Sequence, residues 1–412
     1  MTVGGVDVNE LAETYGTPLL ALDADVLDAA VAEFSALAQT LDLDVAYAGK
    51  ALLFVALARR IAATPLGLDV CSLGELLTAE RADVAAERLV MHGSGKTDAE
   101  LQAAADGRVG RLVADHHDEL VRLARVARPE RPLRVLLRVN SGIEAHTHAY
   151  VRTGGEESKF GFAPAQIAAA AHVVLATPGL LLAGIHTHLG SQIFDAAPYV
   201  AAAPVALEAF ATLVELGAPA TDLIMGGGFG VDARPGGERL DLAAALGEVA
   251  TTIRELAAKL AIAPPRLGIE PGRAIVARAG TSLYRVAAVK RQGARRFAVV
   301  DGGIADNPRP ALYGAFHPAT LAGRSGAATL EETTVCGRSC ENDRLVVAPL
   351  PVDLAAGDLI AMGTTGAYTY SMASNYNRFP KPAVVLAGGG AHRLAVRRET
   401  DADTLRNDLD DA

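Results

Sequence analysis

The feature that most constrains the fold is a regular alternation of short apolar segments with longer alanine- and leucine-rich segments over the first two-thirds of the chain. Short apolar runs are typical of buried strands, and the longer segments have helical spacing. Eight strands, each followed by a helix, are the number that closes a parallel (β/α)8 barrel. The expected strands are residues 45–48, 68–71, 89–92, 112–114, 135–139, 184–188, 223–225 and 267–269, and the expected helices include 51–64, 98–105, 164–176, 198–217 and 240–261.

The alternative is a doubly wound open sheet, which is built from the same strand–helix units. That fold commonly opens with a G-x-G-x-x-G loop, and no such fingerprint opens the first unit. We therefore expect the barrel. Thr97 followed by Glu100 has the spacing of a capping box, which predicts the start of one of its helices.

After about Arg278 the pattern changes to β-rich stretches separated by turns: TSLYRVAAVKRQ, RRFAVVDGG, EETTVCG, DRLVVAPLP and GDLIAMG. These stretches predict a C-terminal, mostly antiparallel β domain, and the strand-like segment TPLLALDAD near the start could join its sheet. We expect a barrel domain over residues 25–277 and a β-rich domain formed by residues 1–24 and 278–412. The acidic tail, 399–412, is expected to be frayed.

Composition argues against several classes of function. The formal net charge is −10 and no dense run of lysine or arginine occurs, so neither nucleic acid nor a membrane surface is an expected partner. The first residues lack the pattern of a signal peptide, and no uninterrupted apolar stretch reaches membrane-spanning length. Three cysteines are too few for a disulfide framework and lack zinc-type spacing. A cytoplasmic location is expected.

Polar residues occur at the ends of the expected strands, where a parallel barrel carries its working residues. Lys50 follows the first strand in YAGK and is one of only six lysines. A lone lysine at a strand end is more commonly a solvated surface charge. Asp69 lies in the second strand, and Glu270 and Arg273 follow the eighth in EPGR.

Two further motifs follow the sixth and seventh strands. His186 and His188 in GIHTHLGSQ have His-x-His spacing, but a metal site needs a third ligand and none stands at a suitable spacing, so no metal is expected. One ring is then a buried structural histidine, or it stacks on a flat cofactor. Gly226, Gly227 and Gly228 lie where this barrel usually binds phosphate, because glycine lets backbone N–H groups approach the anion.

An amine, a glycine loop, an imidazole and a carboxylate together fit the requirements of pyridoxal 5'-phosphate (PLP). The lysine forms a Schiff base, and the carboxylate keeps the ring nitrogen protonated so that the ring accepts electrons when a bond at Cα breaks. The residues thus predict carbanion chemistry on an amino acid. They leave open which bond breaks.

The ordered motifs resemble those of the diaminopimelate decarboxylases, which belong with ornithine and arginine decarboxylases to the fold-type III group, whose barrel is of the alanine-racemase type. The resemblance covers nearly the whole chain and implies a PLP-dependent carbon–carbon lyase that converts meso-2,6-diaminopimelate into L-lysine, the last step of lysine biosynthesis. It rests on YAGKA, DVCSLGEL, EAHTHAYVRTGGEESKFGF, GIHTHLGSQIFD, MGGGFG and IEPGR, and on DNPRPALYGAFH, CGRSCEND and GAYTYSMASNYN in the second domain.

The resemblance implies a role for each motif position. Lys50 would carry the cofactor, His188 would stack on its ring and Glu270 would contact its pyridine nitrogen. Cys340 would be the proton donor to Cα. The other cofactor-binding residues would be Asp69, Ser191, Gly226, Gly227, Gly228, Arg273 and Tyr368, and the substrate-binding residues would be Arg273, Arg309, Tyr313, Glu341 and Tyr368.

In such enzymes Cys340 and Glu341 reach into the active site of the other subunit, which implies a homodimer with shared active sites. Arginines at both 273 and 309 favour a substrate with two carboxylates, because the guanidinium binds carboxylates through a bidentate fork. Two departures from the family pattern bear on specificity. Leu52 stands where many relatives have asparagine, and CEND brings Asp343 one residue nearer to Cys340.

Three alternatives remain open at this point. One is a related decarboxylase that acts on a D-amino acid, arginine or carboxynorspermidine. A racemase is disfavoured because the motifs around Cys340 and Tyr368 resemble decarboxylases. A non-catalytic binding protein with the same fold would be expected to lose Lys50 or the phosphate loop, and this chain keeps both.

Overall fold

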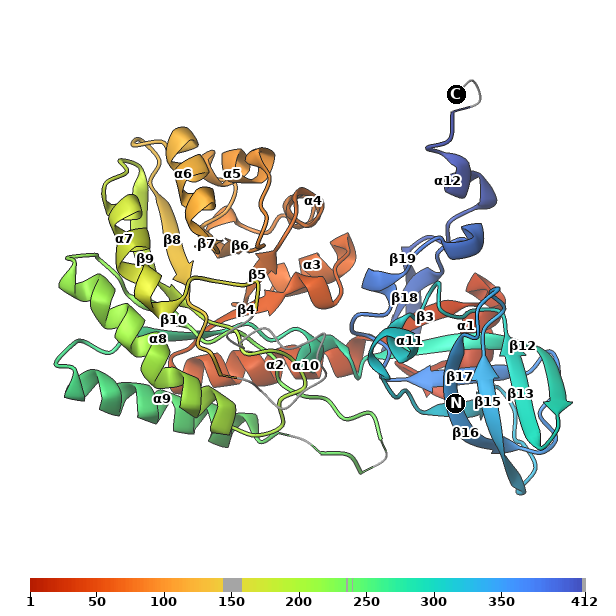
Figure 1. The fold of residues 1–412 in the computed structure, drawn as a ribbon. Coiled ribbons are helices and arrows are strands. Elements are labelled where there is room, and N and C mark those ends of the chain that lie inside the picture. Colours follow the sequence, from red (N-terminus) through yellow and green to blue (C-terminus); the bar gives the residue numbers. More distant parts are fainter. Residues whose placement is uncertain (144–157, 235, 239, 410–412) are drawn as a thin grey trace. The chain divides into compact units, whose positions relative to one another are not determined.

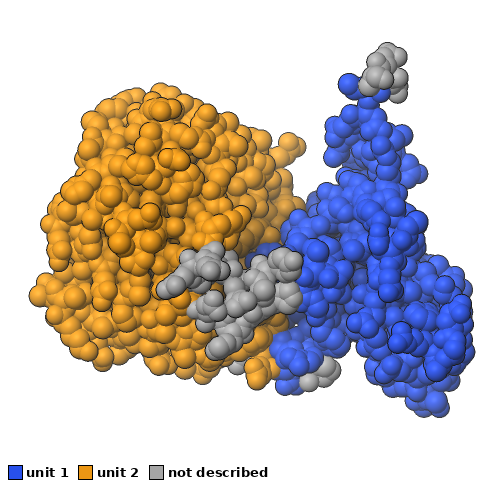
Figure 2. Space-filling model, viewed as in Figure 1, with its two compact units in different colours: residues 1–30, 232–237, 273–412 blue, residues 31–231, 238–272 orange. Residues whose placement is uncertain are grey.

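The computed structural model describes residues 1–143, 158–234, 236–238 and 240–409. The chain divides into two compact units (Figure 2). Unit 1 comprises Met1–Ala30, Asp232–Gly237 and Arg273–Ala412, and unit 2 comprises Val31–Val231 and Glu238–Gly272.

Unit 2 contains a closed parallel barrel with the strand order β10-β11-β4-β5-β6-β7-β8-β9, which confirms the expected fold (Figure 1). All eight predicted strands are present. The largest difference is in β9, which begins at Leu180 and ends at His186, before the second histidine of the motif. The strands are β4 (Asp44–Ala48), β5 (Gly67–Val70), β6 (Leu89–Met91), β7 (Arg111–Ala114), β8 (Leu133–Arg138), β9 (Leu180–His186), β10 (Asp222–Ile224) and β11 (Arg266–Ile269).

Helices lie around the outside of the barrel; α2 precedes the first barrel strand, and α3 to α9 each follow a strand (Figure 1). The capping box is confirmed: the Thr97 hydroxyl accepts a hydrogen bond from the Glu100 N–H at 3.3 Å, and the Glu100 carboxylate accepts one from the Thr97 N–H at 2.7 Å. The helices are α2 (Ala24–Leu41), α3 (Val55–Ala62), α4 (Leu73–Arg81), α5 (Asp98–Ala105), α6 (His117–Val126), α7 (Ile167–Leu175), α8 (Ala197–Glu215) and α9 (Leu242–Lys259).

Among the described helices, α8 is long and apolar enough to cross a membrane. Half of its apolar window is buried inside the protein, and the helix packs against α9 and β9. Such burial is typical of a core helix in a globular domain.

The amino-terminal ends of the barrel strands carry an ionic cluster that the sequence did not predict. Arg111 of β7 pairs with Asp44 of β4 and lies 3.6 Å from the Asp222 carboxylate of β10. Arg134 of β8 pairs with Asp222 at 2.9 Å. Polar groups at this end of a barrel serve stability, whereas the opposite end carries the chemistry.

Unit 1 is built on a nine-stranded sheet in which most pairs are antiparallel, as expected. β3 lies between β12 and β18, so the strand-like segment near the start does join this sheet. The strands are β3 (Leu19–Asp23), β12 (Gly280–Gln292), β13 (Arg295–Val300), β14 (Ala319–Ala322), β15 (Leu330–Cys336), β16 (Arg344–Pro351), β17 (Leu359–Gly363), β18 (Ala383–Gly388) and β19 (Ala391–Val396). The hairpin β1 (Thr2–Val3) and β2 (Val6–Asp7) and the helices α1 (Val8–Tyr15), α10 (Arg273–Val276) and α11 (Arg309–Tyr313) complete it.

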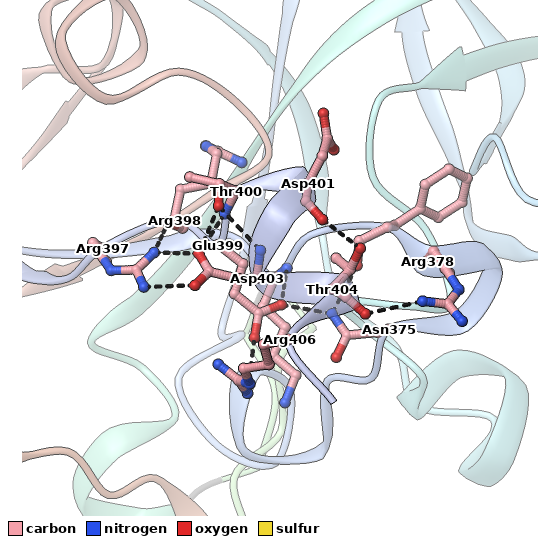
Figure 3. Close-up of polar contacts among 12 residues, drawn as sticks. Asn375, Arg378, Arg397, Arg398, Glu399, Thr400, Asp401, Asp403, Thr404 and Arg406 are labelled. Carbon is pink, nitrogen blue, oxygen red and sulfur yellow. Dashed lines mark hydrogen bonds and ion pairs between the residues drawn. The ribbon is translucent and has the colours of Figure 1, made fainter. Parts of the chain in front are cut away.

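The acidic tail is more ordered than expected, because it forms the short helix α12 (Asp401–Leu405). The Thr400 hydroxyl accepts a hydrogen bond from the Asp403 N–H at 3.1 Å, and the Asp403 carboxylate accepts one from the Thr400 N–H at 2.8 Å. Arg378 donates to the Thr404 carbonyl at 3.1 Å, which attaches the helix to an earlier loop (Figure 3). Hydrogen bonds of the capping box therefore stabilise α12, although its sequence lacks helical apolar spacing.

Candidate active site

Side chains from four barrel strands meet around Glu270, which follows β11. His186, at the end of β9, donates a hydrogen bond from Nε2 to Glu270 Oε2 at 3.0 Å. His92, after β6, has its Nε2 atom 3.0 Å from Glu270 Oε1 and 3.8 Å from Asp69 Oδ1 of β5. The structure thus brings the predicted residues Glu270 and Asp69 together, and it adds His92, which the sequence analysis missed.

The two carboxyl groups of this cluster have opposite pKa shifts. Burial raises the pKa of Asp69 well above its ordinary value, and the charge of Glu270 raises it further. Burial would also raise the pKa of Glu270, but His92 and His186 more than offset it and bring the pKa well below its ordinary range. Neighbouring carboxyl groups with pKa values driven apart are common at active sites. The Glu270 carboxylate is therefore ionised, whereas Asp69 binds its proton more tightly than an exposed aspartate does.

The ring of His186 is buried against His92 and Glu270. The spacing of residues in the sequence does not indicate these neighbours. Burial lowers the pKa of His186 to about 4 despite the opposing effect of Glu270, so the imidazole is neutral at physiological pH. One side-chain nitrogen or oxygen atom from each of His92, His186 and Glu270 lies within 4.8 Å of the other two. The short imidazole–carboxylate contacts account for this clustering.

His188 lies against the glycine triplet that follows β10. The Gly227 N–H donates to His188 Nδ1 at 3.2 Å, which leaves the ring proton on Nε2. A Cβ atom at Gly226 would lie 2.4 Å from His188 Nδ1, and one at Gly227 would lie 2.0 Å from the carbonyl oxygen of Glu270. Only glycine permits this close approach of backbone to ring and backbone to backbone.

Ser191 is brought to the same glycine loop by backbone pairing. The Ile193 N–H donates to the Gly228 carbonyl at 3.0 Å. The Gln192 side chain accepts from the Val231 N–H at 2.9 Å and donates to the Val231 carbonyl at 3.2 Å. The loops after β9 and β10 are therefore held side by side, and Gln192, which the sequence analysis did not single out, is one of the residues that hold them.

Lys50 follows β4 in the short 3-10 turn Gly49–Ala51, and its side chain is exposed. Its charge acts on the titration of both Asp69 and His188. Leu52, one of the departures from the family pattern, is fully buried, and its carbonyl accepts a hydrogen bond from the Tyr47 hydroxyl at 2.5 Å. Three features fit PLP: the glycine triplet 226–228, where a Cβ would clash, the ionised Glu270, and the accessible amine of Lys50.

In unit 1, two buried arginines share an aromatic neighbour. The guanidinium carbon of Arg273 lies 4.8 Å from the ring centre of Tyr368, and that of Arg309 lies 5.6 Å from the same ring. The Arg309 guanidinium carbon is also 5.8 Å from the ring centre of Tyr313. The structure therefore brings together these four predicted residues.

Arg309 forms no ion pair with any carboxylate of the described residues. Its Nη1 donates to the Ala367 carbonyl at 3.1 Å, and its Nε has no hydrogen-bond partner within that part of the chain. Burial, followed by the charge of Arg273, lowers the pKa of Arg309 to about 9. A buried guanidinium without a counter-ion is suited to binding a carboxylate of a ligand.

Cys340 and Glu341 lie on an exposed turn after β15. Asp343 anchors this turn from within: it is buried and accepts a hydrogen bond from the Ser339 hydroxyl at 2.8 Å. The Glu341 carboxylate accepts from the Tyr376 hydroxyl at 2.7 Å. The CEND turn is thus fixed on both sides, and the sequence analysis missed the contribution of Tyr376.

Most of the long motif after β8 lies outside the described residues, which exclude 144–157. In its remaining part, SKFGF, the ring of Phe160 lies 4.4 Å from the guanidinium carbon of Arg138 at the end of β8.

Residues 27–277 match the family described as "Pyridoxal-dependent decarboxylase, pyridoxal binding domain". The chain is 43% identical over 414 residues to a diaminopimelate decarboxylase of Actinosynnema pretiosum subsp. auranticum, covering 99% of this chain and 92% of the relative. It is 39% identical over 420 residues to the diaminopimelate decarboxylase of Bacillus subtilis, covering 99% and 95%. The chain belongs to the diaminopimelate decarboxylase family.

A solved structure agrees with this assignment. The diaminopimelate decarboxylase from Helicobacter pylori, complexed with L-lysine, superposes with a TM-score of 0.89 at 30% identity, covering 97% of this chain and 98% of that one. The resemblance drawn from the motifs is confirmed, as are the PLP cofactor and the decarboxylase class.

The glycine loop offers a direct test of cofactor binding by this family member. Gly227→Ala should weaken PLP binding by about 10-fold or more, because a Cβ would press on the carbonyl of Glu270 and overpacking costs roughly 1–3 kcal/mol. Fluorescence titration of the apoprotein with PLP measures this. Gly247→Ala in α9 is the control, since nothing lies within 4 Å of its Cβ. Equal PLP affinity of Gly227→Ala and wild type would contradict the assignment of the glycine triplet to PLP binding.

Proposed function

We propose that this protein decarboxylates meso-2,6-diaminopimelate to L-lysine and carbon dioxide, which is the last step of lysine biosynthesis. The observation that carries the proposal is the buried guanidinium of Arg309, which lies close to Arg273 and forms no ion pair within the described part of this family member. A substrate with two carboxylates matches two such cations, whereas ornithine or lysine has a cationic distal end that they would repel.

Most of the residues assigned to the cofactor belong to unit 2. Lys50 would carry it, His188 would stack on its ring, and Glu270 would face its pyridine nitrogen. Ser191 and the glycine triplet, together with Tyr368, would hold the phosphate, and Asp69 and Arg273 would also bind the cofactor. When bound, PLP supplies an electron sink for the bond that breaks at Cα. The exposed Lys50 and the ionised Glu270 support these assignments.

The remaining roles concern the substrate. Arg273, Arg309 and Tyr313 would bind carboxylates, with Tyr368 beside them, and Glu341 would recognise the distal end. The thiol of Cys340 would give its proton to Cα after carbon dioxide leaves.

The proposal extends to organisation and location. Because Cys340 and Glu341 lie on an exposed turn, we assign them to the active site of a second copy, in a homodimer with shared sites. The barrel domain, residues 25–277, would bind the cofactor, and the β-rich domain would contribute to substrate binding and to the dimer interface. A cytoplasmic enzyme of lysine synthesis, without nucleic-acid or membrane partners, is the setting that follows.

Release of carbon dioxide from stereoisomers tests the substrate. The PLP-loaded protein should decarboxylate meso-diaminopimelate at its D-configured centre and yield L-lysine, and it should leave LL-diaminopimelate, which has no such centre, unchanged. Arginine, carboxynorspermidine and D-amino acids complete the panel. No turnover of the meso isomer, together with turnover of any other compound, would overturn the proposal in favour of a related decarboxylase. No PLP binding and no turnover would indicate a non-catalytic relative.

A further inference from the structure

Both oxygens of Glu270 are occupied by imidazoles from different strands. His92 Nε2 lies 3.0 Å from Oε1, and His186 Nε2 lies 3.0 Å from Oε2. The two rings also touch edge to face, with centroids 5.1 Å apart and an interplanar angle of 65°. One imidazole therefore lies against each oxygen of the carboxylate, and the two rings contact each other.

We propose that His92 and His186 are positioning residues for the reaction: His186 donates its Nε2–H to one oxygen of Glu270, and His92 keeps its imidazole nitrogen against the other, so that the carboxylate is kept anionic and correctly oriented for the ring nitrogen of the cofactor. This inference rests on the proposed function of Glu270. Neither histidine needs to touch the substrate or the reacting atoms.

The hydrogen-bonding capacity of the groups agrees with this arrangement. A neutral imidazole has one N–H, and donation to a carboxylate places that proton on Nε2. The other nitrogen of His186, Nδ1, is buried and has no hydrogen-bond partner among the described residues, so Glu270 alone fixes its tautomer. His92 Nε2 is also without a hydrogen bond of good geometry among these residues, so its 3.0 Å approach to Glu270 Oε1 is an electrostatic contact. Each carboxylate oxygen has two lone pairs, and Glu270 therefore keeps free capacity for the protonated nitrogen of the cofactor.

Other charged groups also act on this cluster. Asp69 from β5 is a second carboxyl group, and the pKa of that group is raised by burial and by Glu270. Arg138 from β8 interacts electrostatically with Glu270, while Lys50 after β4 acts on Asp69 and on His188. Asp69 disfavours the Glu270 carboxylate, and Arg138 favours it. The two imidazoles are the groups in direct contact.

Loss of an imidazole beside Glu270 should raise the pKa of this carboxyl group. Burial favours the neutral form of a carboxyl group, and without the imidazole N–H this tendency is no longer opposed. The pKa of Glu270 then rises, and its carboxylate is lost as the pH falls through the new value. The cofactor ring loses its anionic partner on the acidic side and keeps it on the alkaline side.

Four variants and one control test the inference. His186→Leu and His92→Leu remove the imidazole beside each oxygen of Glu270, whereas His186→Gln and His92→Gln retain an amide N–H close to the position of Nε2. His172→Gln is the control, because His172 lies exposed on α7, and it should match wild type. The measurements are PLP affinity of the apoprotein, the absorbance of bound cofactor against pH, the melting temperature, and kcat and KM.

The leucine variants should bind PLP about 10- to 100-fold more weakly, the range for losing a hydrogen bond to a charged group, and should lower kcat far more than they raise KM. Their cofactor absorbance should change on acidification where the wild-type spectrum stays constant. The glutamine variants should recover most of each effect. His92, whose side chain is 16% exposed, keeps the test decisive if the buried His186→Leu fails to fold.

Two results would overturn the inference. One is a His92→Leu protein with wild-type PLP affinity and spectrum. The other is equal loss in the leucine and glutamine variants together with a lowered melting temperature, which would indicate only a packing role. Because PLP affinity and absorbance need no substrate, they decide the inference even if meso-diaminopimelate is not the substrate.

Discussion

Replacing Lys50 by alanine should abolish covalent attachment of the cofactor and lower kcat for meso-diaminopimelate by roughly 10³-fold or more, as expected when the nucleophile of a covalent mechanism is removed. Lys50 is exposed after β4, so its loss leaves no cavity in the core. Borohydride reduction followed by intact-mass measurement reports the covalent attachment, and steady-state assays report kcat.

The matched control for this prediction is Lys259→Ala, which removes the same charge from an exposed position in the last turn of α9. That variant should be labelled by PLP and borohydride like wild type and retain its activity. If the Lys50→Ala protein were still labelled to the full extent, another of the six lysines would be the attachment point.

Mixing Lys50→Ala subunits with Cys340→Ala subunits should restore activity, although each variant alone is nearly inactive. If Cys340 serves the active site of the neighbouring subunit, a mixed dimer contains one site that lacks both residues and one that is intact. Random exchange of equal amounts makes half of the dimers mixed, so about a quarter of all sites recover. Activity against mixing ratio, after unfolding and refolding together, measures this.

The control mixture combines Lys50→Ala with the Lys50→Ala, Cys340→Ala double variant, and no pairing of these subunits can form an intact site. It should stay inactive. Absence of recovery in the first mixture, with subunit exchange verified by mass spectrometry of differently tagged chains, would place Cys340 in the site of its own subunit or outside the chemistry.

The fold was largely predictable because its signals are local. Each barrel strand is a short apolar run that ends in polar or glycine residues, as in the segment from β4 to Lys50. The central position of β3 was also visible as strand-like sequence. The helix α12 was missed, since it depends on a capping box rather than on apolar spacing.

The site was predictable only where a motif stands at the end of a strand. The contact of Glu270 with His92 and His186 joins the ends of β11, β6 and β9, and no linear spacing reveals it, because closure of the barrel creates the proximity. The same holds for Gln192 and Val231, which meet because neighbouring loops pair. His92 could have been suspected because it is the last residue of a predicted strand, in MHGSGK.

The placement of β3 has a consequence for the order in which a ribosome-bound chain can fold. This strand, LLALD, is synthesised before the barrel, and its partners β12 and β18 follow only after the whole barrel. Domains generally fold as units during synthesis, so the barrel can form while β3 still has two unpaired edges. An apolar strand in that state is open to pairing with other chains. The newborn protein is therefore most vulnerable to aggregation late in translation, until the last strands of unit 1 appear.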